Sequence, residues 1–457
     1  MTRKMLISIL VLITLLTGCA TPTTEPTPPP QVETEAPQPI VTEAPTEEPA
    51  ATEAPVVEEE ITLRFILPEG GGRPEGYTKV LEAYKKLKPN VTITLETIPF
   101  KDYNGQLPVM WASSDPADIA LVDSCDVKYY AHSGALAVLD NVFTEEDKAD
   151  IVPSLLEEAS LDGVIYGAPF VISTQGVFYN TEMFEDAGIT VPQSVEESWT
   201  WDEYVEKVKA VVANEKSKGN DVWGLVFITN PPNIDIWSHL VVRSFGEKDS
   251  PTFKAISDDG TQVSGYLDTP EAMEAYKFWQ DLYVTWKLAP QSTVPDAFGN
   301  KQAATMISFA AWGGVLKGKF PDLKWGVAPL PYARTRIAHL GEFVPVASAN
   351  GKNVEAAKEF LKFLASSEGI LAYNEATTMI PVRKSLIPQI AVFNEMPLKL
   401  FADQMVAYGV PRPMSVGHPI YNSIFGQMMV DIAQGADINV VVPNAVSEID
   451  SQLAQYK

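Results

Sequence analysis

Apolar, β-branched runs alternate with amphipathic stretches along most of the chain. Ile61–Leu67, Val91–Ile98 and Ala117–Val122 are short and rich in apolar residues, which predicts three buried strands. Between them, residues 74–87 and 101–112 carry apolar side chains at helical spacing. Strands and helices in this order favour a parallel sheet that is covered on both faces.

Such a sheet binds ligands outside the carboxyl ends of its strands. The pattern therefore directs attention to the loops at residues 68–73 and 123–126.

Start signals predict three further helices. Thr200 and Glu203 have the spacing of a capping box. Thr269–Pro270 places proline at a first helical position, and an apolar stripe runs from there to Trp286. Asn353 is expected to cap the third helix. Two short strands are expected beside the third helix, at Trp325–Leu330 and Phe343–Ala347.

The N-terminus has the organisation of an export signal. Arg3 and Lys4 precede an apolar run over residues 5–16, which is too short to span a bilayer. The following Leu16-Thr17-Gly18-Cys19 resembles the lipobox of bacterial lipoproteins, in which the cysteine is acylated and becomes the first residue. The alternative is a plain signal peptide that ends near a cysteine. We expect residues 1–18 to be removed and Cys19 to carry the lipid.

Residues 19–60 are expected to form a disordered tether. After Cys19 they consist almost entirely of Thr, Pro, Glu and Ala and contain no aromatic residue. A segment of this composition cannot bury enough apolar surface to offset its ordering entropy. Its prolines and repelling glutamates favour an extended chain.

Charge and cysteine content narrow the function classes. The formal net charge is −25, whereas a nucleic-acid partner requires a basic face, so we expect no nucleic-acid binding. Cys19 and Cys125 are the two cysteines, and lipidation of Cys19 leaves no intramolecular disulfide. Cys125 is then expected to be a buried thiol. Residues 61–457 are long enough for two cores.

Motifs of metal, cofactor and nucleophile enzymes are missing from the sequence. It contains no HExxH, no paired CxxC, no GxxxxGK[ST] and no GxSxG. We therefore expect no metal, no cofactor and no catalytic residue. A glycosidase needs only two carboxylates far apart in sequence, so a lipid-anchored carbohydrate-active enzyme stays open as an alternative.

Several segments together resemble the extracellular solute-binding proteins of sugar ABC importers, in particular the maltose and maltodextrin type. The segments are Tyr179–Ile189, Trp199–Glu203, Trp325–Pro331, Ala356–Gly369 and Ile380–Lys384. Each motif alone is weak, and their joint order over residues 61–457 makes the match strong.

The resemblance implies an α/β fold of two lobes, each a mixed sheet flanked by helices. The first lobe is expected at residues 61–171 and 332–372, and the second at 172–331 and 373–457. A solute would bind between lobes that close about a hinge. The protein would be a monomer that faces outside the cell, held to the membrane by its lipid, and would deliver the solute to an ABC permease.

Sugars need planar polar groups for their hydroxyls and aromatic rings for their C–H faces. By position we expect the solute to contact Glu69, Asp123 and Ser124 on the first lobe, Thr174 and Gln175 at the crossover, and Trp237, Trp312 and Arg383 on the second lobe. Trp312 is the strongest of these, because an aromatic residue beside a Gly-Gly pair on a loop is hard to explain by packing.

Each candidate also has a plain structural alternative. Glu69 could be a solvated turn residue, Asp123 a helix cap, Trp237 a core residue, and Arg383 a partner in a stabilising ion pair. The pair Tyr129–Tyr130 is expected in the core. The first-strand loop contains no tryptophan or histidine, so no particular sugar is indicated. Glycerol phosphates, polyamines and peptides remain open as solutes, and a rigid adhesive surface protein remains open as a function.

Overall fold

A four-stranded sheet forms the first lobe of the protein. The computed structural model describes residues 59–457 except 71, 114, 140–141 and 233–234, and the expected signal, Cys19 and most of the tether lie outside these residues. The strands, in the order β12-β3-β1-β2, are β1 (Ile61–Pro68), β2 (Val91–Ile98), β3 (Ile119–Asp123) and β12 (Phe343–Ala347). β1 runs parallel to β2 and β3, as predicted. β12 is antiparallel to β3, so the sheet is mixed.

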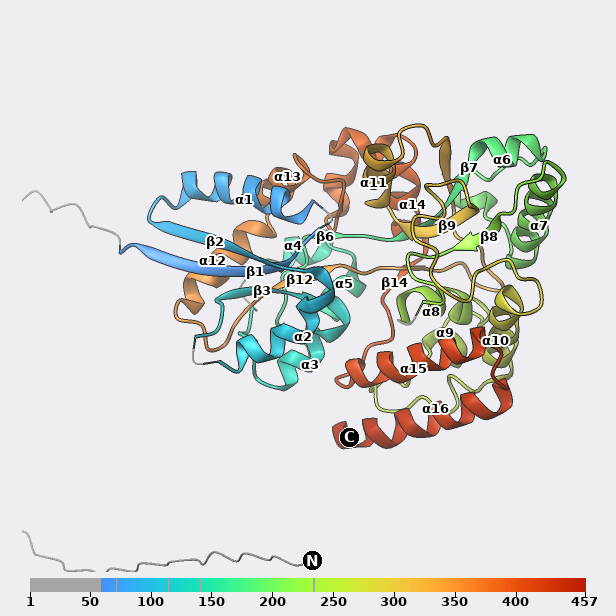
Figure 1. Ribbon diagram of the computed structural model, residues 1–457. Helices are drawn as coiled ribbons and strands as arrows, with labels where there is room; N and C mark the ends of the chain where they lie inside the picture. Colours follow the sequence, from blue (N-terminus) through green and yellow to red (C-terminus); the bar gives the residue numbers. More distant parts are fainter. Residues whose placement is uncertain (1–58, 71, 114, 140–141, 233–234) are drawn as a thin grey trace, which may run out of the picture. The chain divides into compact units, whose positions relative to one another are not determined.

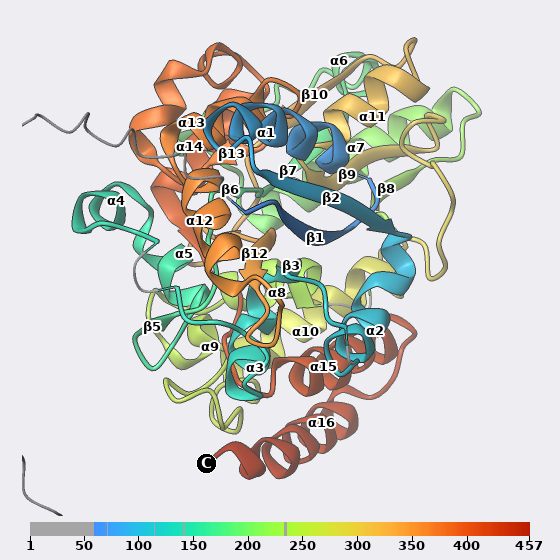
Figure 2. The same cartoon turned by 90° about the vertical axis from the view of Figure 1, so that its left-hand side faces the viewer.

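Helices cover both faces of this sheet. They are α1 (Arg73–Leu87), α2 (Phe100–Trp111), α3 (Val127–His132), α12 (Val354–Leu364) and α13 (Ser367–Asn374). α1 and α13 pack together on one side of the sheet, and α2 and α3 lie on the other (Figures 1 and 2). Asn353 takes the N-cap position of α12, but its side chain bonds the Thr62 carbonyl instead of capping the helix.

A second four-stranded sheet organises the rest of the chain. Its strands, in the order β10-β7-β9-β8, are β7 (Gln175–Asn180), β8 (Trp223–Val226), β9 (Ala303–Phe309) and β10 (Trp325–Ala328). β7 is antiparallel to both of its neighbours, and β8 is parallel to β9. β10 and β12 therefore belong to different sheets, although they lie close together in the sequence.

The main helices of the second lobe are α6 (Thr181–Asp186), α7 (Trp201–Ser217), α8 (Asp235–Ser244), α10 (Pro270–Tyr283), α11 (Trp312–Lys319), α15 (His418–Ala433) and α16 (Ile438–Leu453). The predicted capping box is confirmed, because Thr200 and Glu203 exchange both bonds at the start of α7. The prediction that the apolar stripe of α10 extends to Trp286 is wrong. Helix α10 ends at Tyr283, and Trp286 lies beyond it with Lys209 over its ring.

Short strand pairs accompany the passages of the chain between the two sheets. β6 (Val171–Ile172), just before β7, pairs with β13 (Ile380–Pro381). β11 (Ala338–His339), just before β12, pairs with β14 (Gly409–Val410). Helix α14 (Leu398–Tyr408) lies between β13 and β14 in the chain. Its Gln404 donates to the Gln175 carbonyl and accepts from the Leu330 N–H, so one buried amide ties two passages together.

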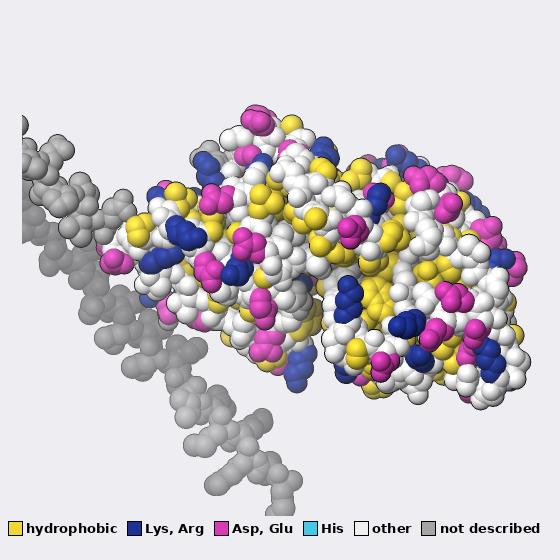
Figure 3. Space-filling view, turned by 90° about the horizontal axis from the view of Figure 1, so that it is seen from above, with side chains coloured by type: hydrophobic (Ala, Val, Ile, Leu, Met, Phe, Trp, Pro, Cys, Tyr) yellow, Lys and Arg dark blue, Asp and Glu magenta, His cyan; other side chains and the backbone are white. Residues whose placement is uncertain are grey.

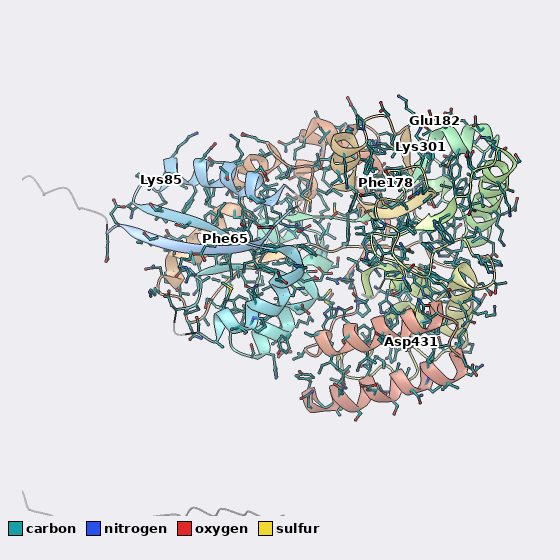
Figure 4. The ribbon with its side chains drawn as sticks, in the orientation of Figure 1. Phe65, Lys85, Phe178, Glu182, Lys301 and Asp431 are labelled. Carbon is teal, nitrogen blue, oxygen red and sulfur yellow. The ribbon has the colours of Figure 1, made fainter. Side chains whose placement is uncertain are left out.

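Each sheet is the centre of a packed core, as Phe65 in β1 and Phe178 in β7 illustrate (Figure 4). Both side chains are fully buried. Phe65 meets the ring of Tyr77 with a centroid separation of 4.7 Å, and Phe178 meets Trp325 at 5.4 Å. Burying such a ring stabilises the fold by roughly 1.5–3 kcal/mol.

Candidate functional site

The carboxyl end of β3 faces the segment that leads into β12. Asp123 ends β3, and the short helix η1 (Ser124–Asp126) follows. The Ser124 N–H donates to the Glu342 carbonyl at 3.1 Å, and the Glu342 carboxylate pairs with Arg73 of α1. The two predicted residues, Asp123 and Ser124, are therefore held in place by backbone pairing. Asp123 does not cap the short helix through its side chain.

Asp123 is engaged instead by an arginine from the second lobe. Arg412, on the segment between β14 and α15, pairs with Asp123 and also with Asp235 at the start of α8, where the nitrogen–oxygen distance is 3.2 Å. The Arg412 and Asp235 side chains are 4% and 0% exposed, whereas Asp123 keeps 27% of its side chain exposed. A buried arginine thus joins carboxylates of both lobes.

His418 extends this network from the first residue of α15. Its Nδ1 lies 2.7 Å from Asp126 Oδ1, and its Nε2 lies 3.3 Å from Asp235 Oδ2. Burial disfavours the charged ring, but its hydrogen bonds with Asp126, Asp235 and Cys125 outweigh this effect and raise the pKa of His418 well above its ordinary value. Burial also opposes ionisation of Asp235, yet Arg412 and His418 lower its pKa. We call Asp123, Asp126, Asp235, Arg412 and His418 the interlobe cluster.

Two further titratable groups border the interlobe cluster. Burial raises the pKa of Glu158 to about 7, against the opposing effects of Arg412 and of Ser124. Burial likewise raises the pKa of the Cys125 thiol to about 12, although Arg412 and His418 favour its thiolate. The expected burial of Cys125 is confirmed. The sequence offered no base beside this thiol, and the fold places His418 there.

Unpartnered polar atoms gather where the chain first passes to the second sheet. Ser173, Thr174 and Gln175 are at most 4% exposed. Ser173 Oγ, Thr174 Oγ1 and both polar atoms of the Gln175 side chain have no hydrogen-bond partner among the described residues. Such groups cost free energy when they are buried unpaired. A polar ligand would satisfy them.

These atoms lie next to the interlobe cluster and to the second sheet. Ser173 bridges to Gly341, and a Cβ built on Gly341 would lie 3.9 Å from Arg412 Nε, which is itself unpartnered. On the side of the second sheet, Gly176 pairs with Ser308 of β9, whose buried hydroxyl also lacks a partner among the described residues. Hydroxyl, amide and guanidinium groups of both lobes therefore border one region.

Aromatic rings continue the region into the second lobe. Phe309, the β9 partner of Gln175, meets Trp237 with ring centroids 4.9 Å apart, and Trp237 meets Phe227 at 6.0 Å. Phe227 and Trp312 line a cavity of about 250 Å³. Trp237 is 3% exposed, so it belongs to the core as well as to this row of rings.

Trp312 differs in one respect from the sequence expectation. It begins helix α11 instead of lying on a loop, and the space above Gly313 is taken by Trp325, 3.1 Å from a built Cβ. Trp312 is partly buried and lines the cavity. Seen from above, the surface is hollowed between the two lobes, with acidic and basic side chains scattered on either side (Figure 3).

Two predicted residues lie apart from the interlobe cluster. Glu69 is exposed in the turn after β1. Arg383 is 9% exposed, pairs with Asp147 at 2.7 Å and donates twice to the Ala365 carbonyl. The Arg383 guanidinium is thus taken up by the stabilising ion pair that the sequence left open as its alternative role. Of the pair expected in the core, Tyr130 is buried and packs on Trp111 and Tyr129, whereas Tyr129 is only partly buried.

Asp235, Arg412 and His418 are the participants that sequence reasoning missed. Arg412 lies 289 positions from Asp123, and His418 lies 292 positions from Asp126. The available signals were modest: Arg412 stands between two prolines, and His418 and Pro419 open an apolar helix. Neither pattern points to a partner in the other lobe.

In the part of the chain that the structure describes, no three His, Cys, Asp or Glu side chains are arranged to hold a metal ion. None of the helices described there has the length and apolar character required to cross a bilayer.

Comparison with known proteins identifies related chains. Residues 70–370 match the family model described as bacterial extracellular solute-binding protein. The diacetylchitobiose binding protein DasA of Streptomyces coelicolor is 26% identical over 69% of this chain and 72% of its own length. The arabinooligosaccharide-binding protein of Bacillus subtilis is 25% identical over 64% of this chain and 66% of its own length.

Solved structures show the same fold. The ABC substrate-binding protein Lmo0181 of Listeria monocytogenes, solved in complex with cycloalternan, superposes with a TM-score of 0.74. It is 19% identical, and the match covers 87% of this chain and 100% of that protein. At this identity the likeness establishes the two-lobed α/β fold of periplasmic binding proteins.

Proposed function

Because this chain belongs to the bacterial extracellular solute-binding protein family, we propose that it captures a sugar between its two lobes for an ABC import system. The observation that carries the proposal is the group of buried polar atoms without partners at Ser173, Thr174 and Gln175. A sugar supplies both donors and acceptors, so it would satisfy these atoms together. The aromatic row that ends at the Trp312 cavity supplies the apolar surface that sugar C–H faces need.

The charge balance of the site supports a neutral solute. Arg412, a cation that borders the unpartnered atoms, is already paired with Asp123 and Asp235. Arg383, the other basic candidate, is paired with Asp147. A phosphate-bearing solute would need a cation that no carboxylate has neutralised. A polyamine would have to displace arginine and histidine from the carboxylates.

In this proposal the residues have separate roles. Thr174 and Gln175 bind sugar hydroxyls from the crossover, Asp123 and Ser124 contribute from the first lobe, and Trp312 stacks on a ring. Trp237 supports the aromatic row, and Glu69 lies at the rim. We assign Arg383 to the stability of the fold.

The wider assembly is also part of the proposal. A lipid on Cys19 and the segment 19–60 would hold a monomeric receptor at the outer face of the membrane, near a permease that takes up the solute. The lobes would comprise residues 61–171 with 332–372, and 172–331 with 373–457. The chain would perform no chemistry on the solute.

A thermal-shift screen tests the central claim. Mono- and disaccharides are compared with glycerol phosphate, spermidine and short peptides. A ligand at 100 times its dissociation constant adds about 2.7 kcal/mol of stability, which displaces the transition measurably. A shift with sugars alone supports the proposal, whereas a shift confined to the other solutes, or none at all, contradicts it. Cleavage of an oligosaccharide during incubation would contradict the receptor role and support an enzyme.

A further inference from the structure

The imidazole of His418 lies between one carboxylate from each lobe. Asp126, in the helical turn after β3, faces Nδ1 at 2.7 Å, and Asp235, at the start of α8, faces Nε2 at 3.3 Å. His418 itself begins α15, at the end of the segment that descends from β14 (Figure 1). The ring therefore bridges the first lobe and the second.

This geometry depends on the protonation of the ring. A carboxylate only accepts hydrogen bonds, and a neutral imidazole has a single N–H to donate. Only the imidazolium can donate to both aspartates at once. When the proton leaves, one ring nitrogen presents a lone pair to a carboxylate, and that contact becomes repulsive.

We propose that His418 is a pH-dependent clasp between the lobes, whose loss of a proton weakens lobe closure and so promotes release of the bound solute. The effect of His418 on solute release rests on the proposed function, because it concerns the same region between the lobes. Its effect on lobe closure does not depend on that function.

The groups packed around His418 come from several elements. The β3 end and η1 contribute Asp123, Cys125 and Asp126, and α5 (Pro153–Glu158) contributes Glu158 near Arg412. Asp235 and His239 come from α8, Arg412 from the segment before α15, and Tyr421 from α15 itself.

Most of these groups keep one protonation state near neutral pH. Burial raises the pKa of Cys125 to about 12 and that of Tyr421 well above its ordinary value, so both stay protonated. Burial lowers the pKa of His239, which stays neutral. Three groups of this set remain: contacts with Cys125 and two aspartates raise the pKa of His418, and burial raises the pKa of Glu158 to about 7 and that of Asp123 above its ordinary value.

Protonation of His418 and protonation of Glu158 both favour closure of the lobes. The pKa of His418 is raised, so its stabilisation is complete below about pH 6.5 and is lost as the pH rises through the higher value. Burial raises the pKa of Glu158 from 4.5 to about 7, so its protonated form favours closure fully below about pH 4.5, and this support is lost by pH 7. A response above pH 7 that His418→Gln removes therefore belongs to His418.

The test uses the mature chain without ligand. Small-angle X-ray scattering follows lobe opening from about pH 5 to pH 9, and NMR of labelled histidine gives the pKa of each imidazole. The radius of gyration should rise with a midpoint at the pKa of His418. Each unit by which that pKa exceeds its value in the open form corresponds to an about tenfold loss in the closed-to-open ratio.

Variants separate the contributions. His418→Gln should remove the response above pH 7, Asp126→Asn should lower the pKa of His418 by about one unit, and Glu158→Gln should keep that response. The exposed His132 provides the control, because His132→Gln should retain the wild-type profile. If His418→Gln does not fold, Asp126→Asn and the titration of the wild-type protein still decide the question.

Two results would overturn the clasp. One is a wild-type scattering profile in His418→Gln, and the other is a pKa of His418 at or below about 6.5. Since neither measurement involves a solute, a failure of sugar binding in the thermal-shift screen would leave this outcome unaffected. Conversely, a receptor that binds sugar with no pH-dependent opening would refute the clasp alone.

Discussion

Thr174 allows the proposed binding region to be tested through two effects of opposite sign. Its hydroxyl is buried, with 0% of the residue exposed, and has no partner among the described residues. Thr174→Val replaces that hydroxyl by a methyl group of nearly the same shape. An unpaired buried polar group costs about 1–3 kcal/mol, so the unliganded variant should be more stable than the wild type by about 1–2 kcal/mol.

The affinity of the same variant should fall. If the hydroxyl bonds the sugar, its loss removes a contact of about 0.5–1.5 kcal/mol, which corresponds to roughly two- to tenfold weaker binding. Urea unfolding of the unliganded protein gives the stability change, and isothermal titration calorimetry with the sugar that shifts the transition most gives the affinity change.

Thr305 provides a matched control in the second sheet. Its hydroxyl is equally buried but is satisfied, because it donates to the Gly224 carbonyl at 2.7 Å and lies 2.6 Å from the Tyr204 hydroxyl. Thr305→Val leaves both partners unpaired and should destabilise the protein by about 1–3 kcal/mol. The reasoning is refuted if Thr174→Val lowers stability as Thr305→Val does, or if its affinity for the sugar is unchanged.

Three further substitutions test other parts of the structure. Trp312→Ala should weaken sugar binding at least tenfold without unfolding the protein, as intrinsic fluorescence and calorimetry would show, because it removes a stacking surface of about 1.5–3 kcal/mol. Arg383→Met should leave affinity intact and lower stability in urea by about 1–3 kcal/mol, because it removes the pair with Asp147. Glu158→Gln should raise stability relative to the wild type by about 3 kcal/mol at about pH 8 and by little at about pH 4, since burial raises the pKa of this carboxyl to about 7.

The contrary outcomes are equally specific. Unchanged affinity in Trp312→Ala would exclude stacking by that ring. Weaker sugar binding in Arg383→Met, with stability preserved, would return Arg383 to the binding residues. A stability difference in Glu158→Gln that does not vary with pH would show that Glu158 does not titrate in this range.

Local elements follow closely from the sequence, because short-range physics specifies them. The capping box at Thr200 and Glu203, the proline after Thr269 and the apolar run of Val91–Ile98 each predict an element that the structure contains. Helical spacing and capping involve residues that lie within a few positions of one another. The extension to Trp286 was wrong for the same reason, since the apolar spacing continues there while the helix ends at Tyr283.

Some of the candidate site residues could also be proposed from their position in the sequence. Asp123 and Ser124 follow a strand, and Thr174 and Gln175 interrupt an apolar passage, so each pair could be proposed from its position. The role of Arg383 could not be predicted from its position in the sequence. Whether an arginine meets a ligand or a carboxylate depends on where Asp147 and the Ala365 carbonyl lie, and both are distant in the chain.

By itself, then, the sequence determined much of the order of strands and helices and, through its resemblance, the two-lobed architecture, whereas the export signal and the role of the crossover residues stay predictions. Only the tertiary structure decided that β12 joins the first sheet and that Arg412 and His418 face the aspartates after β3. The physical reason is separation along the chain. These partners are 289 and 292 positions apart, so their meeting depends on the path of the whole backbone through both lobes, and no local pattern of polar and apolar residues encodes that path.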